Sequence, residues 1–208
     1  MFISFEGTEG VGKSTLIRGV EAFLVGEGHK VLITREPGGT PVAEKLRAIL
    51  INPDTEEIIP PESELLIFSA ARLQNIQNKI APALDDKYIV LSDRYEDSLF
   101  SYQVYGRGLP QKLFSILSDN FVKLKPDLTL WLDMPTEIAM ARVSKRGELD
   151  RFEKEKNDFF KKVHQGYSFL HLNNPNRIKK INANQTPSEV LSDSILQIQL
   201  ALTKKMGE

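Results

Sequence analysis

The stretch Gly7-Thr8-Glu9-Gly10-Val11-Gly12-Lys13-Ser14 decides the fold of this 208-residue chain. It matches the pattern G-x4-G-K-[ST] and follows an apolar run, Phe2 to Phe5. A stretch of helical period comes next, with one apolar face made of Leu16, Val20, Phe23 and Leu24. Glycines let successive backbone N–H groups turn inward, and the N-terminus of a helix favours an anion. The stretch therefore predicts a P-loop, which binds phosphates between a strand and a helix.

In a P-loop each polar residue has a specific task. Lys13 is expected to reach the β and γ phosphates of ATP, while Ser14 ligates Mg²⁺. The ATP-binding loop is expected to run from Gly7 to Thr15. A glycine turn with an exposed lysine is the plain alternative. P-loops also serve GTPases, motors and partition ATPases, but the chain has no Asn-Lys-x-Asp guanine reader and no extra lysine early in the loop.

Beyond the P-loop, short apolar runs alternate with stretches of helical period. This rhythm predicts an α/β fold of the P-loop kinase type, with a five-stranded parallel sheet flanked by helices and a short lid segment. The chain has no linker or repeat, so residues 1–208 are expected to form a single domain. The expected strands are Phe2 to Phe5, Lys30 to Thr34, Tyr88 to Ser92, Leu128 to Leu132 and Arg177 to Ile181.

Further helices are expected over Pro41 to Leu50, about Pro61 to Lys79, Gln111 to Val122, and from Pro135 to about Val143. A last helix should begin at Thr186-Pro187-Ser188-Glu189, which is a capping box with proline at the first helical position. Its buried stripe would be Leu191, Ile195, Ile198 and Leu202.

Composition excludes several classes of function. With 27 basic and 28 acidic residues, the net charge of −1 provides no field that would hold a nucleic acid polymer or an anionic membrane surface. The absence of cysteine excludes disulfides and thiolate metal sites and fits a cytoplasmic setting. The first residues lack the basic region and the long apolar core typical of a signal peptide, and no long apolar run follows, so neither export nor membrane insertion is expected. An anionic ligand must therefore be met by locally placed cations.

Two further loops follow strand candidates, where open α/β sheets bind ligands. Asp93-Arg94-Tyr95 comes after one of them, so Asp93 could order the waters of Mg²⁺ while Arg94 clamps phosphoryl oxygens. Arg35-Glu36-Pro37-Gly38-Gly39-Thr40 comes after another. Taken alone, the first could be a surface ion pair and the second a Pro-Gly turn.

Taken in order, these motifs carry a resemblance. The Arg35–Thr40 loop, then Phe68-Ser69-Ala70-Ala71-Arg72, then Asp93-Arg94-Tyr95 resemble the thymidylate kinases of bacterial type. The likeness continues through Tyr105–Leu109, Lys125–Thr129 and Arg146–Arg151. It implies transfer of the γ-phosphoryl group of ATP to thymidine monophosphate (dTMP), with Mg²⁺, by a homodimer that supplies dTTP for DNA synthesis. The family's dimer suggests the helices that follow Pro61 and Gln111 as its face.

The resemblance also implies an acceptor site. Phe68 would stack on thymine, Arg72 would bond the base edge, and Arg94 would hold the acceptor phosphate. Gln103 would touch the base, and Tyr102 would crowd the 2′ position. The full implied set is Glu6, Glu36, Pro37, Phe68, Arg72, Arg94, Ser98, Tyr102 and Gln103, with a cis bond between Glu36 and Pro37. Phe68 and Arg72 are four residues apart, on one helix face, although Phe68 alone would equally suit a core.

The basic segment from Ser144 to Arg151 could be a solvated charge run, but the resemblance implies a mobile lid over residues 144–151. Arg146 and Arg151 would assist the transfer, complementing Gly10, where another branch of the family carries an arginine. Arg142 would stack on adenine, and residues 183–185 would contact it through the backbone. The expected catalytic set is Lys13, Arg94, Arg146 and Arg151.

The chain departs from the family's pattern at Leu99 and Ser101, where a small polar residue and alanine are usual. Leucine cannot bond the base, so the stringency for thymine stays open. Two other functions remain: a kinase for another nucleoside monophosphate or deoxynucleoside, and a nucleotide-dependent switch without enzymatic activity. A nucleotide-dependent switch has no need of a second phosphate site, so Arg72 and Arg94 argue against that function.

Overall fold

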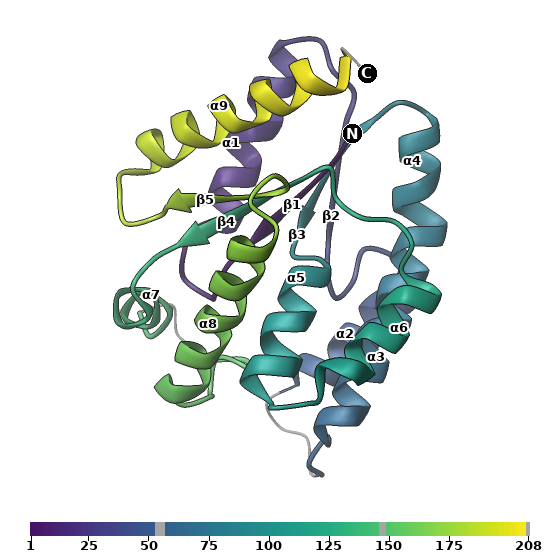
Figure 1. Ribbon diagram of the computed structural model, residues 1–208, viewed down its shortest axis with the longest axis vertical. Helices are drawn as coiled ribbons and strands as arrows, with labels where there is room; N and C mark the ends of the chain where they lie inside the picture. Colours follow the sequence, from purple (N-terminus) through teal and green to yellow (C-terminus); the bar gives the residue numbers. More distant parts are fainter. Residues whose placement is uncertain (53–56, 146–148, 207–208) are drawn as a thin grey trace.

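The computed structural model describes residues 1–52, 57–145 and 149–206, and these form an α/β fold around one parallel sheet (Figure 1). The sheet has the strand order β2-β3-β1-β4-β5, and every neighbouring pair is parallel. Its strands are β1 (Phe2–Glu6), β2 (Val31–Arg35), β3 (Ile89–Asp93), β4 (Leu128–Asp133) and β5 (Ile178–Asn182). All five expected strands and the predicted fold class are confirmed.

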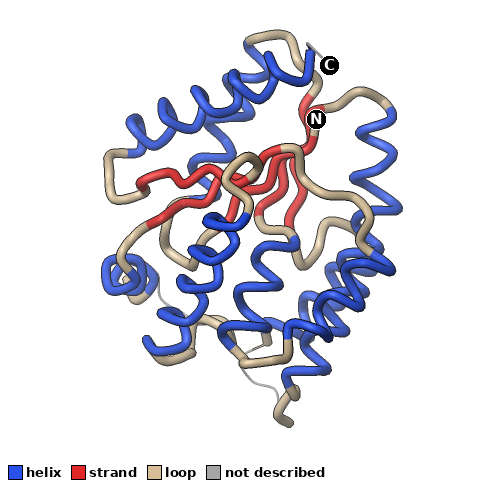
Figure 2. Tube along the Cα trace, in the orientation of Figure 1, coloured by secondary structure: helices blue, strands red, loops and turns tan. Residues whose placement is uncertain are grey.

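Helices cover both faces of the sheet. The bounds are α1 (Lys13–Gly26), α2 (Pro41–Ile51), α3 (Pro61–Asn75), α4 (Ala81–Asp85), α5 (Glu96–Leu99), α6 (Gln111–Phe121), α7 (Thr136–Val143), α8 (Asn157–Asn173) and α9 (Pro187–Met206), with π-helices η1 (Ile76–Ile80) and η2 (Phe100–Gly106). In Figure 1, α1 and α9 lie together on one face, while α5 and α8 lie on the other. Figure 2 shows the strands enclosed between these two layers.

The alternation of β1 shows how both faces become core. Ile3 and Phe5 pack with Val20 and Ile198 from the first layer, whereas Phe2 packs with Tyr95 on the opposite side. Residues on both faces of a parallel sheet are buried, so its strands have apolar side chains in both directions. The capping box is confirmed, since the N–H of Glu189 donates to Thr186 Oγ1 at 3.3 Å and Glu189 Oε2 accepts from the N–H of Thr186 at 2.9 Å.

Three helical regions differ from expectation, and one of them is the continuous stretch of α5 and η2, where no helix was expected. The helix predicted to end near Lys79 continues through η1 and α4 to Asp85, because the π-helical turn directly before Pro82 accommodates a residue without an N–H donor. Helix α8 was not predicted, although its buried residues Phe159, Phe160, Val163 and Tyr167 have helical spacing. No described helix combines the length and the apolar character that crossing a bilayer requires.

Candidate active site

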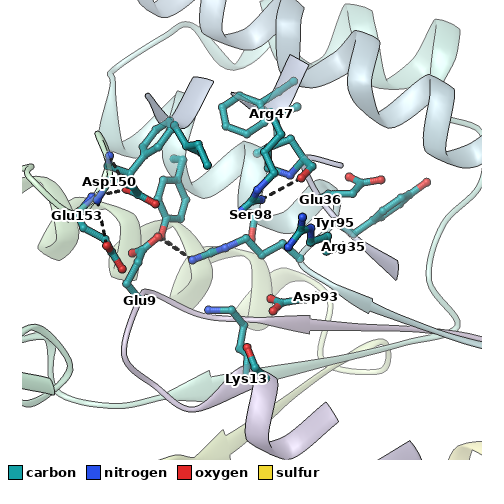
Figure 3. Close-up of a pocket in the computed structure, with 18 of the residues that line it drawn as sticks. Glu9, Lys13, Arg35, Glu36, Arg47, Asp93, Tyr95, Ser98, Asp150 and Glu153 are labelled. Carbon is teal, nitrogen blue, oxygen red and sulfur yellow. Dashed lines mark hydrogen bonds and ion pairs between the residues drawn. The ribbon is translucent and has the colours of Figure 1, made fainter. Parts of the chain in front are cut away.

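The loops after β1, β2 and β3 converge at the carboxyl edge of the sheet around a cavity of about 490 Å³ (Figure 3). The P-loop forms one wall, and the residues after β2 and β3 form the opposite wall. Among the predicted site residues, those that line it are Glu9, Gly10, Gly12, Lys13, Ser14, Thr15, Glu36, Pro37, Phe68, Arg72, Asp93, Arg94, Ser98, Tyr102 and Arg142. Residues far apart in the sequence thus meet in one pocket.

The P-loop has the backbone shape that its glycines predict. Gly10 has a φ of 77°, and a Cβ built there would lie 2.3 Å from the carbonyl oxygen of Ala139, so no side chain fits. Gly12 has a φ of 98° and stands at the N-cap of α1. Left-handed backbone of this kind favours glycine. The N-terminus of α1 is therefore free to face an anion in the cavity.

Lys13 is buried at the centre of this loop. Its Nζ donates to the carbonyl oxygens of Gly7 at 2.9 Å and Thr8 at 2.8 Å. Burial, together with the nearby Arg94 guanidinium, lowers the pKa of Lys13 to about 8, although Asp93 opposes the shift. A buried ammonium with only neutral partners is a strong site for an anionic oxygen.

Ser14 and Asp93 bring two oxygen donors to the same edge. Both line the cavity. The described residues contain no cluster of three His, Asp or Glu side chains that could hold a metal unaided. Hydroxyl and carboxylate oxygens are nevertheless the ligands that Mg²⁺ uses together with water and substrate phosphates. The donor set fits an ion that arrives with a nucleotide.

Arg94 connects the two walls. One terminal nitrogen, Nη1, donates to Gly7 O at 2.8 Å, to Ser98 Oγ at 3.1 Å and to Tyr167 OH at 3.2 Å. The other, Nη2, donates to Glu9 Oε1 at 2.8 Å and to Tyr102 OH at 3.1 Å. A guanidinium fixed at this many points has little freedom left to lose when an anion binds.

Glu36 and Arg72 form a buried ion pair in the opposite wall. Arg72 Nε donates to Glu36 Oε2 at 2.6 Å, and Asn75 Nδ2 donates to Oε1 at 3.3 Å. Burial raises the pKa of Glu36, and the pairing with Arg72 opposes that shift. Arg72 Nη1 is buried without a hydrogen-bond partner among the described residues, so it keeps a donor for a ligand. The expected cis bond between Glu36 and Pro37 is present.

Phe68 and Tyr102 add aromatic surface to the pocket. Phe68 is half-buried on α3, one turn before Arg72, and both side chains line the cavity as their spacing predicts. The hydroxyl of Tyr102 donates to both carboxylate oxygens of Glu9, at 2.8 and 2.7 Å. Leu99 also lines the cavity, with an apolar side chain at the position where the sequence departs from the family's pattern.

Two predicted acceptor residues lie behind the wall rather than in it. Gln103 is fully buried, and its Nε2 donates to Glu64 at 2.9 Å. Glu6 is also fully buried, with its carboxyl group against Ser98 Oγ. Burial, together with the nearby Asp97 carboxylate, raises the pKa of Glu6 to about 8. Both side chains are in position to support the residues that do line the cavity.

The lid prediction falls partly outside the described residues. Arg146 belongs to residues 146–148, which the structure does not describe. Arg142 is exposed near the end of α7 and lines the cavity. Arg151 does not line it, and its guanidinium instead donates to Glu64 and, at 2.7 Å, to the carbonyl oxygen of Leu50. Its assignment to the transfer step stays a prediction.

Sequence reasoning missed several residues that surround the cavity. Arg47 lines it from α2, donating to the carbonyl oxygen of Pro37 at 2.9 Å. Tyr167 reaches Arg94 from α8, the helix that was not predicted. Phe152 and Glu153 line it from the segment before α8, next to Asp150 of the predicted lid. The period of α8 was a usable signal, but no local motif marks Arg47 or this segment.

Comparisons with known proteins agree with this geometry. A family model described as "Thymidylate kinase" matches residues 5–195. The thymidylate kinase of Acinetobacter baylyi is 49% identical over 199 residues, covering 96% of this chain and 98% of the relative. That of Alkalilimnicola ehrlichii is 43% identical, covering 92% and 88%. A crystal structure of thymidylate kinase from Ehrlichia chaffeensis has a TM-score of 0.77 at 30% identity, covering 96% and 98%. The similarity runs along nearly the whole chain.

Proposed function

Because the chain belongs to the thymidylate kinase family, we propose a role for each wall of its pocket in the reaction of that family. The enzyme transfers the γ-phosphoryl group of ATP to dTMP, giving ADP and thymidine diphosphate on the way to dTTP for DNA synthesis. One observation carries the assignment of the site. A P-loop lysine, Lys13, and a second set of cations, Arg72 and Arg94, line the same cavity.

On the donor side, the P-loop from Gly7 to Thr15 binds the phosphates of ATP, and Lys13 moves its hydrogen bonds from loop carbonyls to phosphoryl oxygens. Arg142 packs on the adenine, and residues 183–185 contact it through the backbone. Ser14 and Asp93 hold Mg²⁺ directly or through its waters, and the ion, when bound, neutralises charge on the β and γ phosphates.

On the acceptor side, Phe68 stacks on thymine while the free Nη1 of Arg72 donates to a base carbonyl. Arg94 and the neighbouring Ser98 hold the monophosphate, and Tyr102 restricts space near the 2′ carbon. Glu36 and Pro37 complete this wall, whereas Glu6 and Gln103 act from behind it. A donor from Arg72 matches the O4 carbonyl of thymine and mismatches the amino group of cytosine.

The chemistry needs no general base, because the attacking phosphate oxygen is already an anion. Catalysis then consists of positioning and charge stabilisation, with Lys13 and Arg94 on the two reacting groups. Arg146 of the lid supplies a further cation once both nucleotides are bound, and Arg151 either joins it or anchors the lid. Closing the site in this way also limits hydrolysis by water.

The assembly we propose is a cytoplasmic homodimer. Leu66 on α3 and Leu113 and Ile116 on α6 are 58%, 40% and 48% exposed, and the two helices contact each other. Apolar residues gathered on adjacent helices form a surface that a second copy could cover. The lack of cysteine and the near-neutral charge fit the cytoplasm and the absence of nucleic acid or membrane partners.

The decisive experiment measures ADP release with Mg-ATP over a panel of acceptors. We expect dTMP to give the highest kcat/KM, exceeding the cytidine and purine monophosphates by at least about 100-fold, since a mispaired base edge costs about 1–3 kcal/mol and steric exclusion adds to it. Thymidine itself should be inert because it lacks the phosphate that Arg94 holds. A higher kcat/KM for another acceptor, or turnover of none, would contradict the assignment.

Replacing Phe68 by alanine should weaken the binding of dTMP without affecting the binding of ATP. Stacking of a base on an aromatic ring is worth about 1–3 kcal/mol, so the KM for dTMP should rise about tenfold while that for ATP stays within about twofold. Phe114→Ala is the matched control, because Phe114 packs on the same apolar cluster but does not line the cavity. Equal increases in both KM values after Phe68→Ala would count against stacking.

A further inference from the structure

The segment between the lid and α8 brings an aromatic ring to the acceptor wall. Asp150 Oδ1 accepts from the N–H groups of Phe152 at 2.8 Å and Glu153 at 2.9 Å, which bends the chain toward the cavity. Phe152 lines that cavity and is only 6% exposed. Its ring centroid lies 5.8 Å from that of Phe68 and 6.0 Å from that of Tyr102. One ring thus touches both side chains that we assign to the nucleoside.

Arg151 fixes this segment to the helices beside it. Its backbone N–H donates to the carbonyl oxygen of Ile51 at 3.1 Å and its Nε to that of Leu50 at 2.7 Å, both at the end of α2. The guanidinium also pairs with Glu64 on α3 and lies 4.5 Å from the centroid of the Phe152 ring. The Arg151 guanidinium therefore packs over the Phe152 ring, and Arg151 is itself fixed by its contacts with Leu50, Ile51 and Glu64.

Glu64 is the shared hydrogen-bond acceptor of Arg151 and of two further side chains. Its carboxylate is 1% exposed and accepts from Gln103 Nε2 at 2.9 Å and from Arg107 Nε and Nη2 at 3.1 Å each, besides Arg151. The Arg107 guanidinium stands 5.6 Å from the Phe152 ring. Breaking a buried charge network of this kind is costly. Because Arg107 and Arg151 belong to the network and both pack on Phe152, the position of the Phe152 ring is fixed as well.

From this arrangement we propose that Phe152 is a positioning residue of the acceptor site, which orders Phe68 and Tyr102 to receive the nucleoside. The inference rests on the proposed function, since it takes Phe68 as the surface on which the base stacks. An aromatic side chain that is ordered before binding loses less conformational freedom on binding, which strengthens affinity without a new contact to the ligand. Phe152 should therefore act on the affinity for dTMP and leave ATP and the transfer step almost unchanged.

The chain offers a matched control in Phe159. It is 8% exposed, and its ring lies 5.9 Å from Tyr102 and 4.7 Å from the Arg107 guanidinium, so it shares two of the neighbours of Phe152. Its remaining ring contact is to Phe160, and it does not line the cavity. The comparison of the two positions separates the contacts that Phe152 makes alone, with Phe68, Arg151 and the cavity, from the contacts with Tyr102 and Arg107 that both rings share.

The experiment measures the Kd of dTMP without ATP, and both KM values and kcat, for Phe152→Ala and Phe159→Ala. We expect Phe152→Ala to raise the Kd and KM for dTMP at least about fivefold, with kcat and the KM for ATP within about twofold. Phe159→Ala should leave the affinity for dTMP within about twofold while lowering the unfolding temperature to a similar extent. Leucine at each position gives a second, milder pair of variants. Phe152→Leu should raise the Kd and KM for dTMP about threefold, and Phe159→Leu should leave both unchanged.

Equal effects at the two positions, or a joint rise in the KM of ATP and dTMP, would overturn the positioning role. The leucine pair decides the question if an alanine variant does not fold. Wild-type enzyme that leaves dTMP unmodified would instead contradict the proposed function. Normal wild-type turnover together with unchanged dTMP affinity in Phe152→Ala would remove this inference alone.

Discussion

Lys13→Ala is expected to lower kcat for phosphoryl transfer by about a thousandfold or more, which corresponds to about 4 kcal/mol of transition-state stabilisation. Lys13 is the buried cation of the P-loop, and its Nζ lies within 2.9 Å of two loop carbonyls that a triphosphate would displace as partners. Charge developing on the transferred group meets this ammonium in a site that excludes much of the water, where electrostatic interactions are strong.

The measurement is steady-state kinetics with saturating Mg-ATP and dTMP, together with thermal unfolding. Removal of a buried ammonium relieves its desolvation cost, which offsets the loss of two hydrogen bonds, so the unfolding temperature should change little. Lys45→Ala is a suitable control, since Lys45 is exposed on α2 and does not line the cavity. Near-normal turnover in folded Lys13→Ala protein would remove the lysine from the mechanism.

What the sequence could predict follows from the range of the interactions. The P-loop and the shared face of Phe68 and Arg72 depend on neighbours in the chain, and both are present. The cis Glu36–Pro37 bond, which the family resemblance implied, is present as well. The partners of Glu64 could not be predicted in this way, because Gln103, Arg107 and Arg151 lie 39 to 87 residues away from it in the sequence. No local pattern shows which polar side chains will already be paired inside the protein.

Gln103 illustrates this limit. Successive residues in a helix point about 100° apart, so Tyr102 and Gln103 meet different neighbours. The chain here forms the π-helix η2, whose wider turn shifts the phase that an α-helical period would predict. Tyr102 lines the cavity and Gln103 turns to Glu64. The choice between them depends on a buried carboxylate supplied by α3, which periodicity does not reveal.

Arg94→Ala should have the second large effect, lowering kcat/KM for dTMP by about a thousandfold or more. Arg94 is the one described residue that bonds both the P-loop backbone, at Gly7 O, and the acceptor-side hydroxyls of Ser98 and Tyr102. Its loss removes the cation proposed for the acceptor phosphate. It also leaves the Glu9 carboxylate facing the incoming anion without its ion-pair partner.

Lysine should not replace this arginine. The guanidinium uses Nη1 and Nη2 separately to reach five acceptors, whereas an ammonium is a single point charge, so Arg94→Lys should recover less than about a tenth of the lost kcat/KM. The slow hydrolysis of ATP without acceptor provides the internal comparison. If Arg94 acts on the acceptor, that hydrolysis should stay within about threefold of wild type in Arg94→Ala. A parallel collapse of hydrolysis and transfer would place Arg94 on the donor phosphates instead, because only a group that both reactions share can slow them equally.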